Sequence, residues 1–292
     1  MARFVGAALC THIPRLFILD AAARKAYMGD DVTTMYDAME SLYAEKIGGL
    51  DVDTFIIVDT HWFSTIDYIL NANARLSGSY TSEELPDMIH DYVYDYRGDP
   101  ELADWIAEVG AKNNLRVNAC HYSTLPIHYP SLTTMRYLNP ERKARVLSVS
   151  VCQTAEIHND LAFGQAIGEA VRTLPDDRRV VFLAAGGMSH RFNPYDVILP
   201  KAGANPSNIT TDENRQWDER ILALLLEGKH AEVLGLSSEF KRSASPEGRW
   251  AHYLSMVSAL GGEACTIPGQ LFGAYEAALG TGQANVWFDI HD

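Results

Sequence analysis

Residues 4–14 read Phe-Val-Gly-Ala-Ala-Leu-Cys-Thr-His-Ile-Pro, a short apolar run followed at once by His12. The pattern recurs at residues 54–62, Thr-Phe-Ile-Ile-Val-Asp-Thr-His-Trp, where His61 follows the run. It recurs again at residues 180–190, Val-Val-Phe-Leu-Ala-Ala-Gly-Gly-Met-Ser-His, which ends on His190. Short apolar runs bounded by polar or turn residues are typical of buried parallel strands. The three runs therefore predict strands of one sheet.

Helical patterns alternate with these strands. A fourth strand is predicted at Arg145–Cys152 and a late one at Ala284–Phe288. Four helices are predicted from apolar periodicity and from Gly or Pro stops, at residues 33–47, 160–174, 212–227 and 247–260. The alternation predicts an α/β fold, a single domain over residues 1–292 with a central, mostly parallel sheet flanked by helices.

Composition narrows the class of protein. The chain has 292 residues, of which 47% are hydrophobic, enough for a large core. No apolar stretch approaches roughly 18 residues and the N-terminus lacks a signal-peptide pattern, so we expect a soluble, cytoplasmic protein with no membrane partner. The net charge of −14 argues against nucleic acid as a partner. The four cysteines form no C-x-x-C pair, and we expect Cys10 and Cys152 to be buried without disulfides.

The histidines point to a metal site. The carboxyl ends of strands in an open α/β sheet face one crevice, so His12, His61 and His190 should converge there, and we expect the active site at those ends. A carboxylate beside two histidines completes the facial arrangement of non-haem Fe(II) sites. Glu247, at the predicted start of a helix, is the candidate third ligand and Glu239 is its rival. Each residue also has a structural interpretation, as a core histidine or as an acid favoured in a first helical turn.

Two segments are candidates for covering the crevice. Residues 77–99 are polar and rich in tyrosine, too irregular to place as helix or strand, and fit a lid or an interface. Residues 193–211 are rich in Pro, Asn, Gly and Ser, follow His190 closely, and predict a mobile loop over the crevice.

The sequence resembles the class III extradiol ring-cleavage dioxygenases, the superfamily of protocatechuate 4,5-dioxygenase β subunits, and within it the homoprotocatechuate type. The likeness covers nearly the full chain. It is carried by the motifs at residues 11–14, 59–62, 80–86, 98–102, 187–192 and 280–285. The segments Tyr-Thr-Ser-Glu-Glu-Leu-Pro (80–86) and Gly-Thr-Gly-Gln-Ala-Asn (280–285) resemble the homoprotocatechuate type most.

The resemblance implies an enzyme that opens an aromatic diol with O2 at Fe(II), in aromatic catabolism. His12, His61 and Glu247 would bind the iron, and His190 would be the acid/base residue that moves protons. His128 and Tyr129 fall where the family places pocket residues. The homoprotocatechuate type carries an acidic residue where His128 stands, so the ring substituent stays open among homoprotocatechuate, protocatechuate, gallate and aminophenol.

Other functions remain to be weighed. The same ligands could hold Mn(II), or Zn(II) in a hydrolase, although the chain lacks a His-Glu-x-x-His helix. A noncatalytic binding protein on the same fold is an alternative from another class. We expect a homo-oligomer, with a separate small subunit as the alternative. His121, His158, His230 and His252 are interpreted as surface or structural residues.

Overall fold

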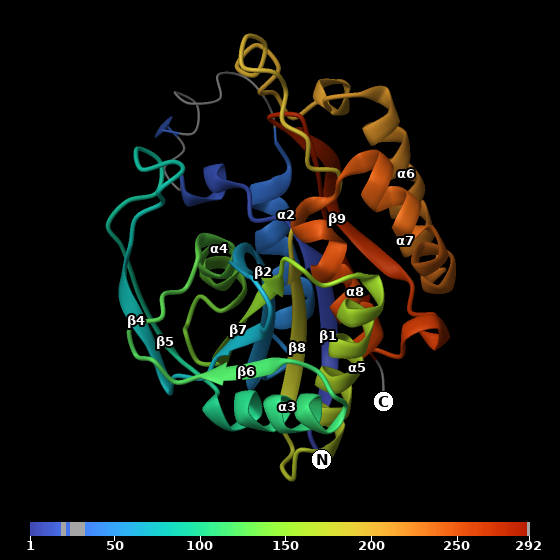
Figure 1. The fold of residues 1–292 in the computed structure, drawn as a ribbon. Helices are drawn as coiled ribbons and strands as arrows, with labels where there is room; N and C mark the ends of the chain where they lie inside the picture. Colours follow the sequence, from blue (N-terminus) through green and yellow to red (C-terminus); the bar gives the residue numbers. More distant parts are fainter. Residues whose placement is uncertain (19–21, 24–32, 291–292) are drawn as a thin grey trace.

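One large sheet lies at the centre of the molecule (Figure 1). The computed structural model describes residues 1–18, 22–23 and 33–290. Eight strands in this part of the chain form the sheet, in the spatial order β6-β3-β7-β2-β8-β1-β10-β9. Their bounds are β1 Arg3–Cys10, β2 Thr54–Ser64, β3 Tyr68–Asn71, β6 Val117–Cys120, β7 Arg145–Cys152, β8 Arg179–Ala185, β9 Gly269–Ala278 and β10 Thr281–Asp289. The predicted α/β fold is confirmed.

The register of the central strands brings their carboxyl ends to one level. Strands β7, β2, β8 and β1 run parallel, and Ala185 at the end of β8 pairs with both Cys10 of β1 and Asp59 of β2. Strands β10 and β9 close one edge in antiparallel pairing, and β3 joins β7 antiparallel at the other side. The three histidine-bearing segments therefore leave the sheet side by side.

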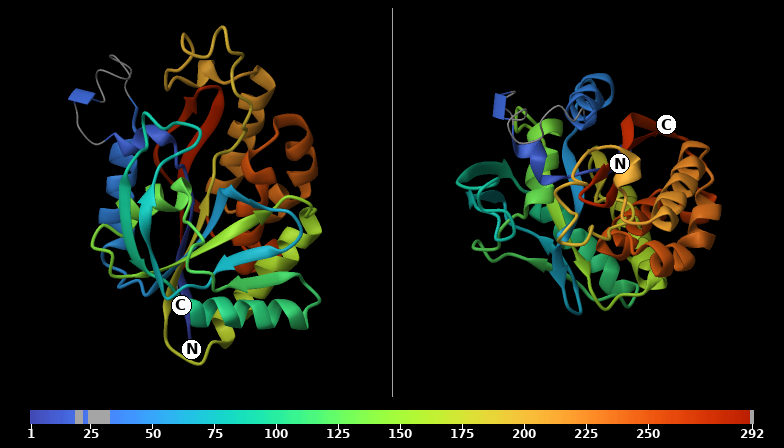
Figure 2. Two further views of the ribbon diagram at one scale, coloured as in Figure 1. Left: turned by 60° about the vertical axis from the view of Figure 1, so that its left-hand side comes forward. Right: turned by 90° about the horizontal axis from the view of Figure 1, so that it is seen from above.

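Helices cover both faces of the sheet because side chains of each strand alternate between two cores. Leu9 of β1 belongs to the larger core, which packs against α3, α5, α6, α7 and α8. Ala8 and Cys10 face the smaller core with α2 and α4. Figure 2 shows the two groups of helices from further directions. The helix bounds are α2 Met35–Leu42, α3 Pro100–Lys112, α4 Tyr129–Leu138, α5 Ile157–Thr173, α6 Asp212–Leu226, α7 His230–Ala244 and α8 Ala251–Ala259.

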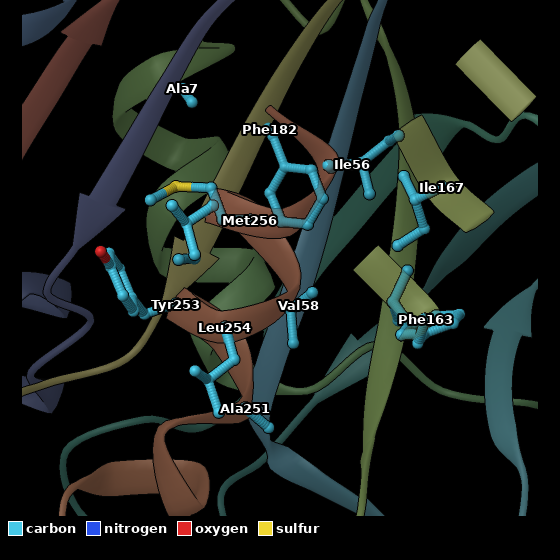
Figure 3. Packing of buried hydrophobic residues seen from close by; sticks show 14 of the residues in the cluster. Ala7, Ile56, Val58, Phe163, Ile167, Phe182, Ala251, Tyr253, Leu254 and Met256 are labelled. Carbon is cyan, nitrogen blue, oxygen red and sulfur yellow. The ribbon is translucent and has the colours of Figure 1, made fainter. Parts of the chain in front are cut away.

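The larger core fixes α5 and α8 against the sheet. Figure 3 shows Phe182 and Val58 of the sheet beside Leu254 and Met256 of α8, with Phe163 and Ile167 of α5 in the same cluster. These labelled side chains are almost wholly buried. Burial of such side chains contributes about 1.5–3 kcal/mol each.

Two predicted elements differ from the structure. The strand predicted to end before His61 continues to Ser64, and its pairing with β7 shifts in register between Asp59 and Phe63. The helix predicted for residues 247–260 begins only at Ala251, because Glu247–Trp250 form a 3-10 turn, η4. Glu247 is thus not a first-turn acid of a regular helix. Helices α3, α4 and α7 were not predicted.

The segment left unplaced at residues 77–99 contains a two-stranded hairpin separate from the main sheet. Its strands are β4 Arg75–Tyr80 and β5 Tyr92–Arg97, and residues 81–91 connect them. Residues 193–211 form a connection with one short 3-10 turn, η3 Pro206–Asn208. None of the helices in the described ranges combines the length and apolar character that a membrane span requires.

Candidate metal centre

Four segments bring the site together at the carboxyl ends of the parallel strands. His12 follows β1, His61 lies at the register shift of β2, and His190 lies beyond the Gly-Gly step after β8. Glu247 arrives from η4, which pairs with the segment after β8. The Glu247 amide donates to the Met188 carbonyl at 3.0 Å, and the His190 amide donates to the Ser245 carbonyl at 3.2 Å. The predicted convergence of His12, His61 and His190 is present.

The three histidine rings converge on one carboxylate oxygen of Glu247. Oε1 of Glu247 lies 3.0 Å from Nε2 of His12, 3.3 Å from Nε2 of His61 and 3.7 Å from Nε2 of His190. The ligand atoms of His12, His61 and Glu247 lie within 4.8 Å of one another. Two imidazoles and a carboxylate on one side of a divalent ion are the donor set of non-haem Fe(II) oxygenases and of catalytic zinc sites. These residues therefore fit a catalytic metal.

Glu247 is held rigidly. It is buried, its Oε2 accepts a hydrogen bond of 2.5 Å from the Gly187 amide, and the Thr60 hydroxyl lies 2.9 Å from Oε1. Burial alone would raise its pKa, but the charge of His12 and hydrogen bonds from His12 and His61 hold the Glu247 pKa well below its usual range. The carboxylate is ionised, as a metal ligand must be.

His61 is oriented from three sides. Its backbone amide donates to Asp59 Oδ1 at 3.0 Å, and its ring Nδ1 lies 3.1 Å from Glu84 Oε1. A carboxylate on the far nitrogen fixes the ring of a metal-binding histidine. Burial lowers the His61 pKa, but the hydrogen bond and charge of Glu247 outweigh it and raise the pKa to about 9. The Tyr129 hydroxyl lies 2.8 Å from His61 Nε2.

His12 is placed through its backbone by the C-terminal hairpin. The Thr11 amide donates to Asn285 Oδ1 at 2.9 Å, and the Thr11 hydroxyl donates to Gln283 Oε1 at 2.6 Å. The Met188 amide donates to the Gly282 carbonyl at 2.9 Å. The β9–β10 hairpin is thus hydrogen-bonded to the segments that carry His12 and His190.

The His190 side chain is 24% exposed and lies beside the Glu247 carboxylate, outside the cluster of His12, His61 and Glu247. Burial lowers the His190 pKa, and the neighbouring His12 and His61 lower it further against the opposing charge of Glu247. Asp218 of α6 fixes the preceding residue, because it accepts the Ser189 amide at 2.8 Å and the Ser189 hydroxyl at 2.6 Å. Asp218 therefore holds the backbone next to the His190 ring, and the lowered pKa favours the neutral form of that ring.

Tyr129 and His128 begin α4, and only Tyr129 reaches the cluster. Asp59 joins α4 to the His61 segment, because its Oδ2 accepts the Ser131 amide at 3.0 Å and hydroxyl at 2.6 Å. The Tyr129 ring centroid lies 4.4 Å from that of His61. The His128 ring instead packs against Trp62, with centroids 6.1 Å apart.

The other predicted residues lie away from the site. Glu239 is exposed on α7, so the geometry favours Glu247 as the third ligand. His230 is buried between the Tyr253 hydroxyl and the Ile267 carbonyl, which is a structural role. His121 and His158 are exposed. His252 is the exception to this separation, because it is fully buried beside Gly186 and Thr60 and interacts electrostatically with Glu247. Cys10 and Cys152 are buried and free, as predicted.

Sequence analysis missed the roles of Glu84 and Asp218. Asp59 and Thr60 are polar neighbours that the sequence places beside His61, where they can orient its ring, but Glu84 belongs to a matched motif without a role. Asp218 stands in the middle of a helix, where an acid usually faces solvent, and no local signal distinguishes it.

Comparison with known proteins identifies the family of this chain. A family model described as the catalytic LigB subunit of aromatic ring-opening dioxygenase matches residues 6–288. The 3,4-dihydroxyphenylacetate 2,3-dioxygenase of Escherichia coli is 30% identical over 262 residues, 89% of this chain and 91% of that protein. The 2-aminophenol 1,6-dioxygenase beta subunit of a Pseudomonas species is 24% identical over 250 residues, 84% of this chain and 80% of that protein.

A solved structure shares the fold. An uncharacterized protein from Escherichia coli K12 superposes with a TM-score of 0.63 over 97% of this chain and 99% of that chain, at 15% sequence identity. At this identity the likeness shows the fold alone.

Proposed function

The chain belongs to the LigB family of catalytic subunits of aromatic ring-opening dioxygenases, and on that premise we propose that it cleaves a substituted catechol at an Fe(II) ion held by His12, His61 and Glu247. It is an extradiol ring-cleavage dioxygenase of the class III, homoprotocatechuate type. The observation that carries the proposed site is the convergence of those three ligand atoms within 4.8 Å of one another.

Fe(II) is proposed on the chemistry of the donor set. An Fe(II) ion held by two histidines and one carboxylate would have ligand positions left for a small aromatic diol and O2. Mn(II) and Zn(II) accept the same ligands and are the alternatives. The family relation removes support from a zinc hydrolase or a noncatalytic protein, since this family opens aromatic rings with oxygen.

The side chains around the ligands have separate tasks in the proposed reaction. His190 takes a proton from a substrate hydroxyl on Nε2, the ring atom 3.7 Å from Glu247 Oε1, and returns it as the ring opens. Its lowered pKa keeps the ring neutral and able to accept that proton near pH 7. The Tyr129 hydroxyl, which lies beside His61 Nε2, would donate a hydrogen bond to a substrate oxygen, and His128, whose ring packs against Trp62, is proposed as a second pocket residue.

For the substrate, we propose a catechol of the homoprotocatechuate type, with 3,4-dihydroxyphenylacetate as the reference compound because the relative of that name is 30% identical. A 2-aminophenol is the second candidate, supported by the other named relative. We further propose that residues 1–292 act as one catalytic domain, in the cytoplasm, as a homo-oligomer. A separate small subunit is the alternative, since the aminophenol relative is named as a beta subunit.

Oxygen uptake tests the proposed function. Protein purified without oxygen and loaded with Fe(II), Mn(II) or Zn(II) is mixed with catechol, 3,4-dihydroxyphenylacetate, protocatechuate, gallate or 2-aminophenol. We expect O2 consumption and a yellow ring-opened product with Fe(II) and a substituted catechol. Turnover with Mn(II) in preference to Fe(II) would reject the metal, and preference for 2-aminophenol would reject the substrate.

A further inference from the structure

A cavity to which the proposed chemistry gives no task lies between the end of α7, the start of α5 and the turn η4. Its volume is about 480 Å³. Small-molecule sites commonly enclose roughly 300–1,000 Å³. Three of the residues that line it are basic, and they come from two of these elements: Lys241 and Arg242 from α7, and Arg249 from η4.

The wall of this cavity is positively charged although the whole chain has a net charge of −14. Among the described residues that line it, Glu156 is the only acid. Its carboxylate lies 3.4 Å from Nη2 of Arg249, and its side chain is 65% exposed. One acid therefore faces three cations. A concave surface lined by one sign of charge attracts small ions of the opposite sign.

Lys241 lacks the partner that a shielded ammonium needs. Its Nζ is buried and has no hydrogen-bond partner in the part of the chain that the structure describes. Burial and the charge of Arg249 lower the Lys241 pKa, against the charges of Asp160 and Glu156. The dipole of α7 favours a basic residue in its last turn, which accounts for the exposed Arg242 but not for an ammonium withdrawn from water. An anion in the cavity would supply the missing partner.

The cavity also touches the segment that carries Glu247. Ser245 and Pro246 line it and directly precede Glu247 in the chain. The Ser245 carbonyl accepts the His190 amide at 3.2 Å, and Pro246 forms an isolated antiparallel bridge with Ser189. A molecule bound in the cavity would therefore contact backbone that is hydrogen-bonded to the His190 segment.

We propose that this cavity is a second binding site, for a small molecule that carries an oxyanion group, a phosphate or a carboxylate. Lys241 and Arg242 bind the oxyanion, because an ammonium and a planar guanidinium both form charge-assisted hydrogen bonds with such groups. The Ser245 hydroxyl accepts Nε of Arg191 at 3.3 Å and has its own proton to donate to the anion. The bound molecule stabilises the turn that carries Glu247.

Anion binding to matched variants tests the site. Fe(II)-loaded protein under nitrogen is titrated by calorimetry with sulfate, which stands in for a phosphate group, or with succinate, and sodium chloride of equal ionic strength is the blank. We expect one site per chain. Lys241→Gln and Arg242→Gln should each raise Kd at least about tenfold, the loss of a hydrogen bond to a charged group. Tighter binding of sulfate identifies a phosphate as the group bound, and tighter binding of succinate a carboxylate.

Two controls exclude other binding places. Lys112→Gln removes the same charge from an exposed position on α3, outside the lining, and should leave Kd unchanged. Metal-free protein should bind the anion as tightly as the loaded protein does. No binding above the chloride blank, an equal loss in Lys112→Gln, or binding that requires the metal would each overturn the proposal.

Hydrogen exchange locates the bound anion. The Arg249 amide donates to the Pro246 carbonyl at 3.1 Å, and we expect its exchange to slow when the anion is present in the parent protein but not in Lys241→Gln. Unchanged exchange despite saturable binding would place the anion elsewhere and overturn the proposal. None of these measurements needs turnover, so a failure of the proposed function, seen as absent oxygen uptake, is distinguishable from a failure of this one.

Discussion

Three histidine rings direct a nitrogen at one oxygen of Glu247, yet each is held by different neighbours. His12 is fixed through the backbone of Thr11, His61 through its ring by Glu84, and His190 through Ser189 and Asp218. Because the supports are independent, single substitutions should separate metal binding from proton transfer.

The first prediction separates the ligands from the acid/base residue. We expect His190→Ala and His190→Phe to keep the metal and lose about 10²- to 10⁴-fold in kcat, because proton transfer loses its base. His12→Ala and His61→Ala should lose the metal as well. Metal content by mass spectrometry and oxygen uptake on the same samples distinguish the two classes. Full activity of His190→Ala would refute its role.

The second prediction concerns Glu84. Glu84→Ala removes the carboxylate that orients His61, and we expect the metal Kd to rise about tenfold, at the low end of such effects because Glu84 is largely exposed. Glu83→Ala, an exposed acid next to it, is the control and should leave the Kd unchanged. Chelator competition measures both, and equal Kd values would show that Glu84 does not support the ligand.

At the scale of the elements, the packing of α5 against α8 forms much of the larger core. A Cβ added at Gly164 of α5 would lie 2.3 Å from the Ser255 carbonyl oxygen of α8, whereas one at Gly235 of α7 would meet nothing within 4 Å. We expect Gly164→Ala to lower the free energy of unfolding by about 1–3 kcal/mol, through overpacking. Gly235→Ala should raise it by up to about 1 kcal/mol, from helix propensity. Urea denaturation of both tests this, and equal stability would contradict the packing.

The contact of α5 with β3 predicts a pH effect on stability. Burial raises the pKa of Asp160 to about 6, although the Tyr68 hydroxyl donates to it at 2.9 Å. Between the unfolded value of 3.8 and about 6 the folded state binds more protons than the unfolded state, so this group makes stability fall as pH rises.

Asp160→Asn keeps the acceptor for Tyr68 and removes that titration. We expect the variant to gain on the order of 3 kcal/mol relative to the parent between pH 4 and pH 7. Urea melts across this range measure the difference, with exposed Asp87→Asn as the control. Parallel pH profiles of parent and Asp160→Asn would show that the carboxyl does not titrate there.

The elements predicted from sequence are those whose pattern is local. The apolar runs of β1, β7 and β8 and the periodicity of α2 and α6 were readable, because burial on a sheet or a helix face imposes those patterns. The backbone bend that carries Glu247 could not be predicted from such a local pattern. Ser245, Arg249 and Trp250 adopt positive φ there, a backbone that tertiary contacts impose against local preference.

The same distinction applies to the candidate site, because residues with a local sequence signal were predictable and residues that act through tertiary contacts were not. His12, His61 and His190 share a local signal, since each follows an apolar run. Asp218 and Glu84 act through contacts between segments distant in sequence, and such contacts leave no periodic trace. The role of the C-terminal hairpin in bracing Thr11 likewise appears only in the folded chain.

At the scale of the whole molecule, the sheet places the segments that carry the candidate ligands. Strands β1 and β8 end level with Asp59 of β2, so the segments that carry His12, His61 and His190 leave the sheet side by side. Residues 81–91 and 193–211 are connections on this scaffold, the kind of segment in which binding residues are commonly found.

The most direct test of the account is the stoichiometry of iron, oxygen and ring opening in one sample. Protein reconstituted anaerobically with Fe(II) is given a limiting amount of 3,4-dihydroxyphenylacetate, and iron content, O2 consumed and ring-opened product are measured together. We predict one iron per chain and one O2 consumed per ring opened, with both iron binding and turnover lost in Glu247→Ala. Full iron binding and turnover in Glu247→Ala, or stoichiometric iron without oxygen uptake in the parent protein, would contradict the account.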